Sequence, residues 1–141
     1  MQNKRNQIQA MFGRIAPRYD RMNRLMTFGR DQAWRRFVVQ QARLNPNSHV
    51  LDIAAGTGDI AFEIRRQYPQ STVIAADFAL PMMQVGKNRP AGHLVHWSAA
   101  DALHLPFPES TFNAVVSGFL FRNVLDIDHA LSEQFRILQP N

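Results

Sequence analysis

One short segment of the chain places an apolar run, two glycines and two carboxylates in close succession, at residues 49–59 (HVLDIAAGTGD). The apolar residues predict a buried strand. Gly56 and Gly58 predict a tight turn into a helix, because glycine has no Cβ to obstruct the turn or the approach of a ligand. Asp52 falls near the carboxyl end of the strand, where open α/β sheets bind their ligands. The segment therefore predicts a site for a nucleotide-like cofactor.

The rest of residues 49–141 alternates between short apolar runs and helical patterns. We expect strands at residues 49–54, 72–76, 93–98 and 112–117, and helices at residues 58–67, 81–88 and 128–138. Because strands that alternate with helices form parallel sheets with right-handed crossovers, this half of the chain predicts an α/β fold.

Residues 1–48 have a different pattern and are expected to form a helical cap beside the core at residues 49–141. A stripe of apolar residues at spacings of three and four predicts helices here: Ile8, Phe12, Ile15, Tyr19, Met22 and Met26. Pro17 interrupts the stripe, so we expect one helix up to Arg14 and a second from Pro17. A third is expected at residues 31–44, with Trp34, Val38 and Ala42 on one face.

The composition narrows the class of protein. The chain has no cysteine, which excludes disulfides and thiolate metal sites. It has no apolar run near the ~20 residues that a membrane span needs, and it does not begin like a signal peptide. His93 and His96 are expected on opposite faces of one strand. We therefore expect no metal site and a cytoplasmic location.

Positive charge is concentrated in the helical cap. Residues 1–48 hold ten Lys and Arg against two Asp, a charge of +8, whereas residues 49–141 carry −3. This asymmetry indicates an anionic partner, such as lipid head groups, nucleic acid or an anionic substrate. An ordinary solvated helix surface is an equally weighted alternative.

The glycine turn fits two kinds of cofactor. Residues 56–61 (GTGDIA) match the G-x-G-x-x-A pattern of dinucleotide sites. The spacing of Asp52, Gly56 and Gly58 also resembles motif I of the class I S-adenosylmethionine (SAM) methyltransferases. A helix N-terminus favours the phosphates of a dinucleotide, but the carboxylates of Asp52 and Asp59 would repel them. They suit the amino-acid end of SAM, so we favour SAM.

Further segments, in order along nearly the whole chain, resemble the ubiquinone/menaquinone biosynthesis C-methyltransferases (the UbiE/MenG/COQ5 family). They are residues 16–23 (APRYDRMN), 28–29 (FG), 34–35 (WR), 51–61 (LDIAAGTGDIA), 105–107 (LPF), 121–124 (FRNV) and 136–140 (RILQP). The resemblance implies a Rossmann-like fold and transfer of a methyl group from SAM to a ring carbon of a prenylated quinol.

The resemblance also implies which residues bind the cofactor: Asp52, Gly56, Thr57, Gly58, Asp77, Asp101, Ala102, Ser117 and Gly118. Asp77 ends the second strand, where an acid bonds ribose hydroxyls, and Asp101 follows the third, where a carboxylate accepts from adenine. Alternatively, Asp77 caps the next helix and Asp101 shapes a loop turn. Acids at three successive strand ends favour the cofactor site.

Residues 117–124 (SGFLFRNV) depart from the family pattern in two places. Gly118 stands at the usual serine and Leu120 at the usual glycine. Arg122 is the candidate catalytic residue, because its cation suits a developing phenolate on the ring or the orientation of a water as base. The alternative for Arg122 is a surface salt bridge. Asn123, Tyr19 and Asp20 are the other candidates, as substrate-binding or lid residues.

The sheet of this family has seven strands, and the sequence shows patterns for only the first four. We expect strands in the order 3-2-1-4, with strands five to seven missing, so that the fourth strand becomes an edge that favours self-association or a partner chain. The sequence is then a truncated gene product, an excised piece or a protein that a partner completes.

We rank three functions: an active quinol methyltransferase that contacts the inner face of the membrane through its basic helices, a SAM-binding fragment without activity of its own, and a methyltransferase acting on another small molecule or on nucleic acid.

Overall fold

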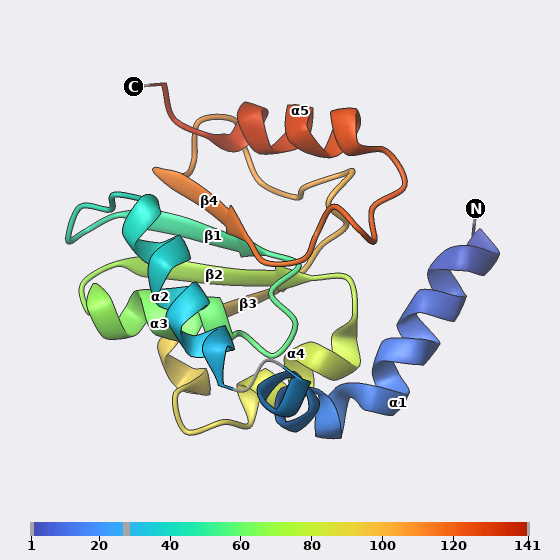
Figure 1. Ribbon diagram of the computed structural model, residues 1–141. Coiled ribbons are helices and arrows are strands. Elements are labelled where there is room, and N and C mark those ends of the chain that lie inside the picture. The colour runs from blue at the N-terminus through green and yellow to red at the C-terminus, as the bar shows by residue number, and fades with distance from the viewer. Residues whose placement is uncertain (1, 27–28, 141) are drawn as a thin grey trace.

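The computed structural model describes residues 2–26 and 29–140, without the side chains of residues 2–5, 8, 9, 19, 20, 23, 24 and 26. Its sheet has four parallel strands: β1 (His49–Ile53), β2 (Thr72–Asp77), β3 (His96–Ala99) and β4 (Ala114–Ser117). They lie in the order β3-β2-β1-β4 (Figure 1). The predicted strand order is confirmed.

Helices cover both faces of this sheet. On one face, α2 (Arg30–Gln41) and α3 (Asp59–Gln67) pack on the strands through Val39 and Ile64, which have no exposed surface. On the other face, Ile137 of α5 (Ile127–Ile137) packs with Leu51 and Phe112. The strand residues therefore alternate between two apolar layers, which fixes the register and brings all four carboxyl ends to one edge.

The first helix, α1 (Gln2–Met26), runs through Pro17 as one element, so the predicted separation into two helices is wrong. Figure 1 shows α1 changing direction partway along its length. Proline removes one helical hydrogen bond and bends the axis, and the turns on either side continue. Ala16, beside the bend, is buried with Ala79 and Met82 at α4 (Leu80–Lys87). Among the described residues, no helix is both long and apolar enough to cross a membrane.

The third strand begins later than expected, because residues 92–94 form the short 3₁₀ helix η1 (Gly92–Leu94). Trp97 explains this turn, since its indole N–H donates to the Gly92 carbonyl oxygen at 3.0 Å. The indole also meets the Phe62 ring edge-on, with 6.0 Å between ring centroids. Trp97 thus connects β3, η1 and α3.

Strand β4 forms an edge of the described sheet, as predicted. Beside its first residues, the chain after α5 returns: Phe112 donates to the Ile137 carbonyl oxygen, and Gln139 donates to the Phe112 carbonyl oxygen, both at 2.9 Å. Residues of β4 itself pair only with β1 among the described strands. Self-association or a partner strand at this edge stays a prediction.

Two helical glycines differ in whether a side chain would fit. A Cβ on Gly86 would overlap the Trp97 indole and come 2.6 Å from the Thr57 carbonyl oxygen, whereas a Cβ on Gly13 would meet only Pro81, at 3.4 Å. Alanine is favoured over glycine in a helix by about 1 kcal/mol. We therefore expect Gly13→Ala to stabilise the fold and Gly86→Ala to destabilise it by more than about 2 kcal/mol, through overpacking. Urea unfolding measures both. A stable Gly86→Ala protein would contradict the tight fit around Trp97.

Candidate cofactor site

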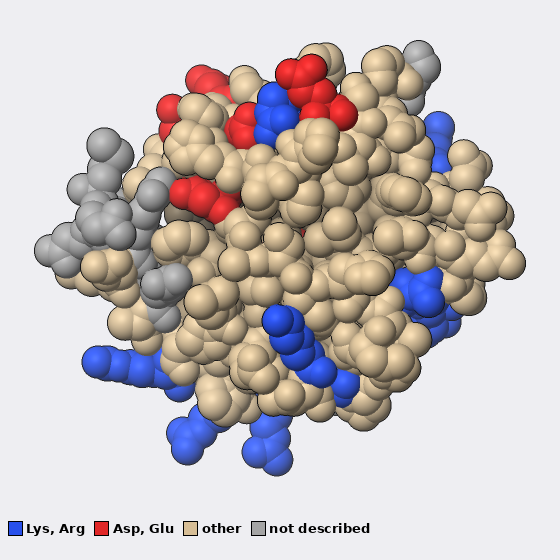
Figure 2. Space-filling model, turned by 180° about the vertical axis from the view of Figure 1, so that it is seen from behind, with Lys and Arg blue, Asp and Glu red and all other residues tan. Residues whose placement is uncertain are grey.

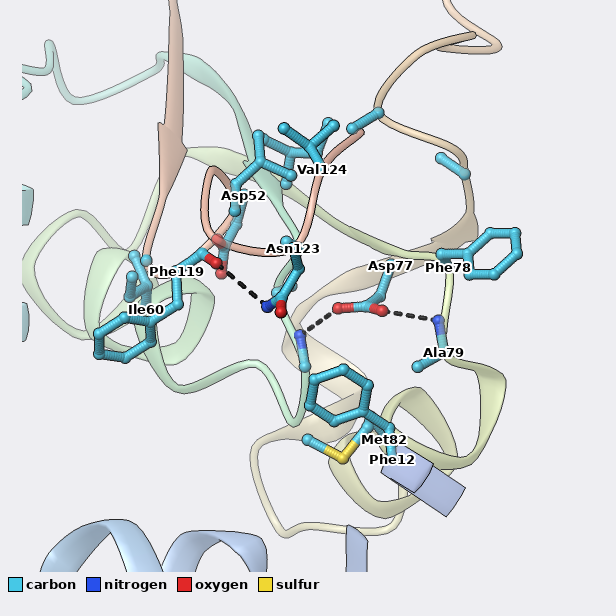
Figure 3. A pocket seen from close by; sticks show the side chains of 18 of the residues that line it. Phe12, Asp52, Ile60, Asp77, Phe78, Ala79, Met82, Phe119, Asn123 and Val124 are labelled. Carbon is cyan, nitrogen blue, oxygen red and sulfur yellow. Dashed lines mark hydrogen bonds between the residues drawn. The ribbon is translucent and has the colours of Figure 1, made fainter. Parts of the chain in front are cut away.

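A cavity of about 190 Å³ opens at the carboxyl ends of the strands. Its floor comes from β1, β2 and the loops that follow β3 and β4, and α1 and α2 also contribute side chains to its wall. Figure 3 shows Asp52, Asn123 and Asp77 in the middle of this cavity, with Phe119 and Ile60 on one side and Phe78 on the other. Phe12 and Met82 lie side by side beneath them.

The turn after β1 is held in place by main-chain hydrogen bonds. Ala55 donates to the Ala76 carbonyl oxygen at 3.1 Å, and Gly58 donates to the Ala55 carbonyl oxygen at 2.9 Å. Ala54, Gly56 and Gly58 all have positive φ, of 56°, 59° and 86°. Glycine accommodates such angles without strain, and Ala54 pays a cost for them. The turn exposes Gly56 and Thr57 to the cavity.

Gly58, which was predicted to bind the cofactor, is not among the residues that line the cavity, and its role toward the cofactor stays a prediction. A Cβ at this position would come 2.6 Å from Cη2 of Trp97. The missing side chain therefore makes room for an indole behind the turn. The spacing of Gly56 and Gly58 fits both a glycine that faces a ligand and a glycine that makes room for a neighbouring side chain. Only the position of Trp97 in the structure distinguishes these two roles.

Asp52 is the most deeply buried acid of the site, with 1% of its surface exposed. Its Oδ2 accepts from the Ala61 N–H at 3.0 Å, and its Oδ1 has no hydrogen-bond partner among the described residues. Burial raises the pKa of Asp52 to about 8, the Ala61 hydrogen bond opposes that rise, and the carboxylates of Asp77 and Asp59 add to it. A buried carboxylate oxygen without a partner at a cavity wall suits a cationic ligand group.

Asp77 joins the turn after β1 to the start of α4. Its Oδ2 accepts from the Gly56 N–H and its Oδ1 from the Ala79 N–H, both at 2.7 Å. Burial raises the pKa of this carboxyl group, and the main-chain donors oppose the rise. Each oxygen keeps lone pairs that can accept from a ligand hydroxyl. The Ala79 N–H lies just before α4, whose N-cap is Ala79 without a side-chain cap hydrogen bond, so the predicted capping of the helix by Asp77 is wrong. The cofactor role of Asp77 stays a prediction.

Asp101 follows β3 and shapes the next loop, as the loop-turn alternative expects. Its Oδ1 accepts from the Leu103 N–H at 3.0 Å, and its main chain pairs with His104. Asp101 and Ala102 also line the cavity. The acids that end β1 and β2 and the acid that follows β3 thus face one space.

A network of ion pairs at the rim was missed by sequence reasoning. Asp59, at the start of α3, pairs with Arg35 of α2 at 2.8 Å and with Arg89 at 2.5 Å. Arg35 also pairs with Asp31, one helical turn earlier, at 3.1 Å. The i, i+4 spacing of Asp31 and Arg35 was visible in the sequence, but the link to Asp59 depends on how α2 packs on α3. The network holds α2 against the cavity.

Only some residues of the segment after β4 line the cavity. Gly118 and Asn123 line the cavity, whereas Ser117 and Arg122 do not. The Arg122 guanidinium lies over the Phe119 ring, 4.5 Å from its centroid, and the Asn123 side-chain N–H donates to the Phe119 carbonyl oxygen at 3.4 Å (Figure 3). Arg122 is exposed and reaches the site only through Phe119.

Two predicted residues, Tyr19 and Asp20, lie on α1, and their side chains fall outside the described residues. Sequence reasoning also missed most of the apolar wall, which includes Phe12, Trp34, Ile60, Phe78, Met82 and Phe119. Phe12 and Trp34 did carry a signal, since both belong to helical stripes, but a stripe does not say whether it faces a core or a ligand.

The strand order and the acids at the strand ends define a Rossmann-like sheet of the class I SAM-dependent methyltransferase type. A solved protein of Methanococcus maripaludis described as a SAM-dependent methyltransferase superposes with a TM-score of 0.77 at 16% identity, over 90% of this chain and 59% of that one. A Haloferax volcanii protein described as a methyltransferase, solved with the activator Trm112, gives 0.75 at 21% identity, over 92% and 56%. At these identities the likeness shows the fold alone.

The chain belongs to the ubiE/COQ5 methyltransferase family, whose model matches residues 1–141. The ubiquinone/menaquinone biosynthesis C-methyltransferase UbiE of Desulfotalea psychrophila is 47% identical over 133 residues, which cover 94% of this chain and 54% of that protein. The demethylmenaquinone methyltransferase of Thermus thermophilus is 45% identical over 132 residues, 92% of this chain and 60% of that protein. The chain therefore spans little more than half the length of these relatives.

The raised pKa of Asp52 makes the stability of the ligand-free protein depend on pH. Between an unfolded-state pKa near 4 and a folded-state pKa of about 8, the native state holds a proton that the unfolded state has lost, so stability falls as pH rises through this range. Asp52→Asn removes the ionising group. We expect this variant to be more stable than the wild type at pH 8 by about 1 kcal/mol or more, with the difference vanishing near pH 4.

Thermal unfolding followed by circular dichroism at pH 4, 6 and 8 measures this difference. Asp126→Asn is the control, because Asp126 is exposed and caps α5, and asparagine caps equally well. A gap between wild type and Asp52→Asn that stays constant with pH would show that Asp52 is ionised in the folded protein.

Proposed function

We propose that the chain forms the cofactor-binding part of an enzyme that transfers a methyl group from SAM to a ring carbon of a prenylated quinol. The product would be menaquinol from demethylmenaquinol, or its counterpart in the ubiquinone pathway. The names of the relatives support the substrate. The observation that carries the cofactor is the meeting of Asp52, Asp77 and Asp101 in one cavity, with an oxygen of Asp52 unpartnered.

The cavity offers matching groups for each part of SAM. Asp52 and the main chain of Gly56 and Thr57 would hold the amino-acid end, where the ammonium group meets the buried carboxylate. Asp77 would accept from the ribose hydroxyls, as acids at this position do. Asp101 and Ala102 would meet adenine on the side where Phe78 lies. Gly118 would contribute main chain near the reacting end.

When bound, SAM supplies an electrophilic methyl group, and the residues around it orient the acceptor and exclude water. Ile60, Met82 and Leu120 give the cavity an apolar lining. The acceptor ring must lose a hydroxyl proton, fully or in part, to become nucleophilic at carbon. Among the described residues that line the cavity there is no histidine or lysine. Asn123 is therefore our first candidate to bind a ring hydroxyl, while Tyr19 and Asp20, on the covering helix, are candidates for closing the site.

Asp77→Asn tests the cofactor half of the proposal. The substitution puts an amide N–H against one of the two main-chain donors, so it should weaken binding of S-adenosylhomocysteine by at least about tenfold, the equivalent of one lost charged hydrogen bond. Asp126→Asn makes the same chemical change at a side chain that does not line the cavity and should leave the affinity unchanged. Calorimetric titration measures both, and circular dichroism confirms that each variant is folded. Equal affinities would remove Asp77 from the site.

A second candidate function is SAM binding without turnover by this chain alone. It is favoured by the open outer edge of β4 and by the length of the relatives, of which the chain covers 54% and 60%. Incubation with labelled SAM and demethylmenaquinol in detergent separates the two. Methylated product supports the first function, and cofactor binding without product supports the second.

We further propose that α1 brings the site to an anionic membrane surface, where a long-tailed quinol resides. Arg14, Arg18 and Arg21 are exposed on α1, together with Met11 and Leu25, which are 50% and 77% exposed. Figure 2 shows basic side chains along the lower part of one face, below the acidic ones. Basic residues beside apolar ones suit a helix that lies on a bilayer.

Replacing Arg14, Arg18 and Arg21 together by glutamine should reduce binding to vesicles that contain phosphatidylglycerol by at least about tenfold, because each cation near an anionic surface contributes about 1 kcal/mol. The control replaces Arg43, Arg66 and Lys87, three exposed cations that do not belong to α1, by glutamine. Co-sedimentation measures binding. Binding that ignores the anionic lipid content, or an equal loss in the control, would contradict a role of α1.

A further inference from the structure

We propose that Trp34 and Phe119 form the wall against which the flat ring of the methyl acceptor stacks, and that Arg122 is a positioning residue that holds Phe119 in place. The inference rests on the proposed function, because it assigns the second half of the same cavity. It concerns a quinone-type ring, and it gives Arg122 a role without contact to the substrate.

The cavity has two chemically different halves. The acids Asp52 and Asp77 lie in its middle, and Phe78 lies on the side that the adenine would take (Figure 3). Phe119 and Ile60 lie on the opposite side (Figure 3). With the acids and the Phe78 side assigned to the cofactor, the Phe119 side is left for an apolar ligand.

Two aromatic rings from distant parts of the chain meet on that side. Trp34 of α2 and Phe119, which follows β4, stack with 5.3 Å between ring centroids and 17° between ring planes. Both line the cavity, yet they remain 38% and 49% exposed. Exposed apolar clusters at the rim of a cavity mark binding surfaces, and aromatic walls favour flat ring ligands.

Gly118 packs against this wall. A Cβ on Gly118 would lie 3.4 Å from Cδ1 of Ile60 and 3.6 Å from Cη2 of Trp34, which is ordinary van der Waals contact. The six-membered ring of Trp34 therefore lies close to bare main chain at the end of β4. Residue 118 adds no side chain of its own to the surface that a flat ring would meet.

Phe119 is fixed by its own loop. The Arg122 guanidinium packs on its ring at 4.5 Å from the centroid, and the Asn123 side chain donates to its carbonyl oxygen at 3.4 Å. Leu120, which is 6% exposed, anchors the loop and accepts from the Asn123 and Val124 N–H groups at 3.0 and 3.2 Å. Arg122 itself does not line the cavity. Its cation acts on the ring of Phe119, which a guanidinium attracts.

The experiment measures two affinities for the chain as it stands. Menadione, a naphthoquinone without a tail, is the ring probe, and equilibrium dialysis in the presence of S-adenosylhomocysteine gives its affinity. The chain has no cysteine for this quinone to alkylate. Phe119→Ala should weaken menadione binding at least about tenfold, the scale of losing one large aromatic contact. Calorimetry should find S-adenosylhomocysteine affinity changed less than about threefold. Phe121→Ala, an exposed phenylalanine two residues away that does not line the cavity, should change neither.

The outcomes separate this inference from the proposed function. If the wild type binds S-adenosylhomocysteine but Phe119→Ala leaves menadione binding unchanged, the aromatic wall is not the ring site and the cofactor site stands. If Phe119→Ala weakens both ligands equally, the wall belongs to the cofactor. If the wild type does not bind S-adenosylhomocysteine, the proposed function falls and this inference falls with it.

Arg122 is tested by a double-mutant cycle with Phe119. If Arg122 acts through Phe119, Arg122→Gln weakens menadione binding in the wild-type background and has no further effect in the Phe119→Ala background. If Arg122 touches the ring oxygens directly, the loss is the same in both backgrounds, which would overturn the positioning role. A general loss of folding would lower the S-adenosylhomocysteine affinity as well, and calorimetry on each variant excludes it.

Discussion

The close packing of Trp97 behind the cofactor turn is the contact on which this site depends most. The indole fills the space that Gly58 and Gly86 leave free, and its N–H binds the Gly92 carbonyl oxygen. One side chain thereby fixes the start of α3, the end of α4 and the beginning of β3 relative to one another. Because the turn lies directly in front of this packing, close-packed side chains support the floor of the cavity.

The front of the turn is held by hydrogen bonds to a buried carboxyl group, at a cost in stability. Asp77 accepts from the main-chain N–H groups of Gly56 in the turn and of Ala79 just before α4, and Asp52 is buried nearby with one oxygen unpartnered. Burial raises the pKa of both carboxyl groups. Stability is thus given up where a cationic ligand would restore it, which is a common arrangement at functional sites. Asp59 differs, since two arginines already neutralise it, so it supports the rim and leaves ligand charge to Asp52.

The sequence predicted features that depend on local patterns. Strand order, the acids at the strand ends and the turn at Gly56 all follow from alternation and spacing within short windows, and the structure confirms them. Features that depend on contacts between residues far apart in the sequence were not predicted. The purpose of Gly58 required the position of Trp97, and the start of β3 required the Gly92 hydrogen bond. The continuity of α1 through Pro17 required its packing against α4. In each case the tertiary contact decides between local alternatives of similar energy.

The acidic half and the aromatic half of the cavity come from different parts of the fold. This difference indicates which half would determine the acceptor that is methylated. The acids belong to strand ends that the core holds, so they are fixed by the fold. Phe12, Trp34 and Phe119 come from α1, α2 and the loop after β4, which meet only at the cavity. Side chains on such covering segments can change without disturbing the sheet. Under the function proposed above, the same cofactor floor could serve different acceptors, and the shape of the aromatic wall, more than the acids below it, would select a flat quinol ring.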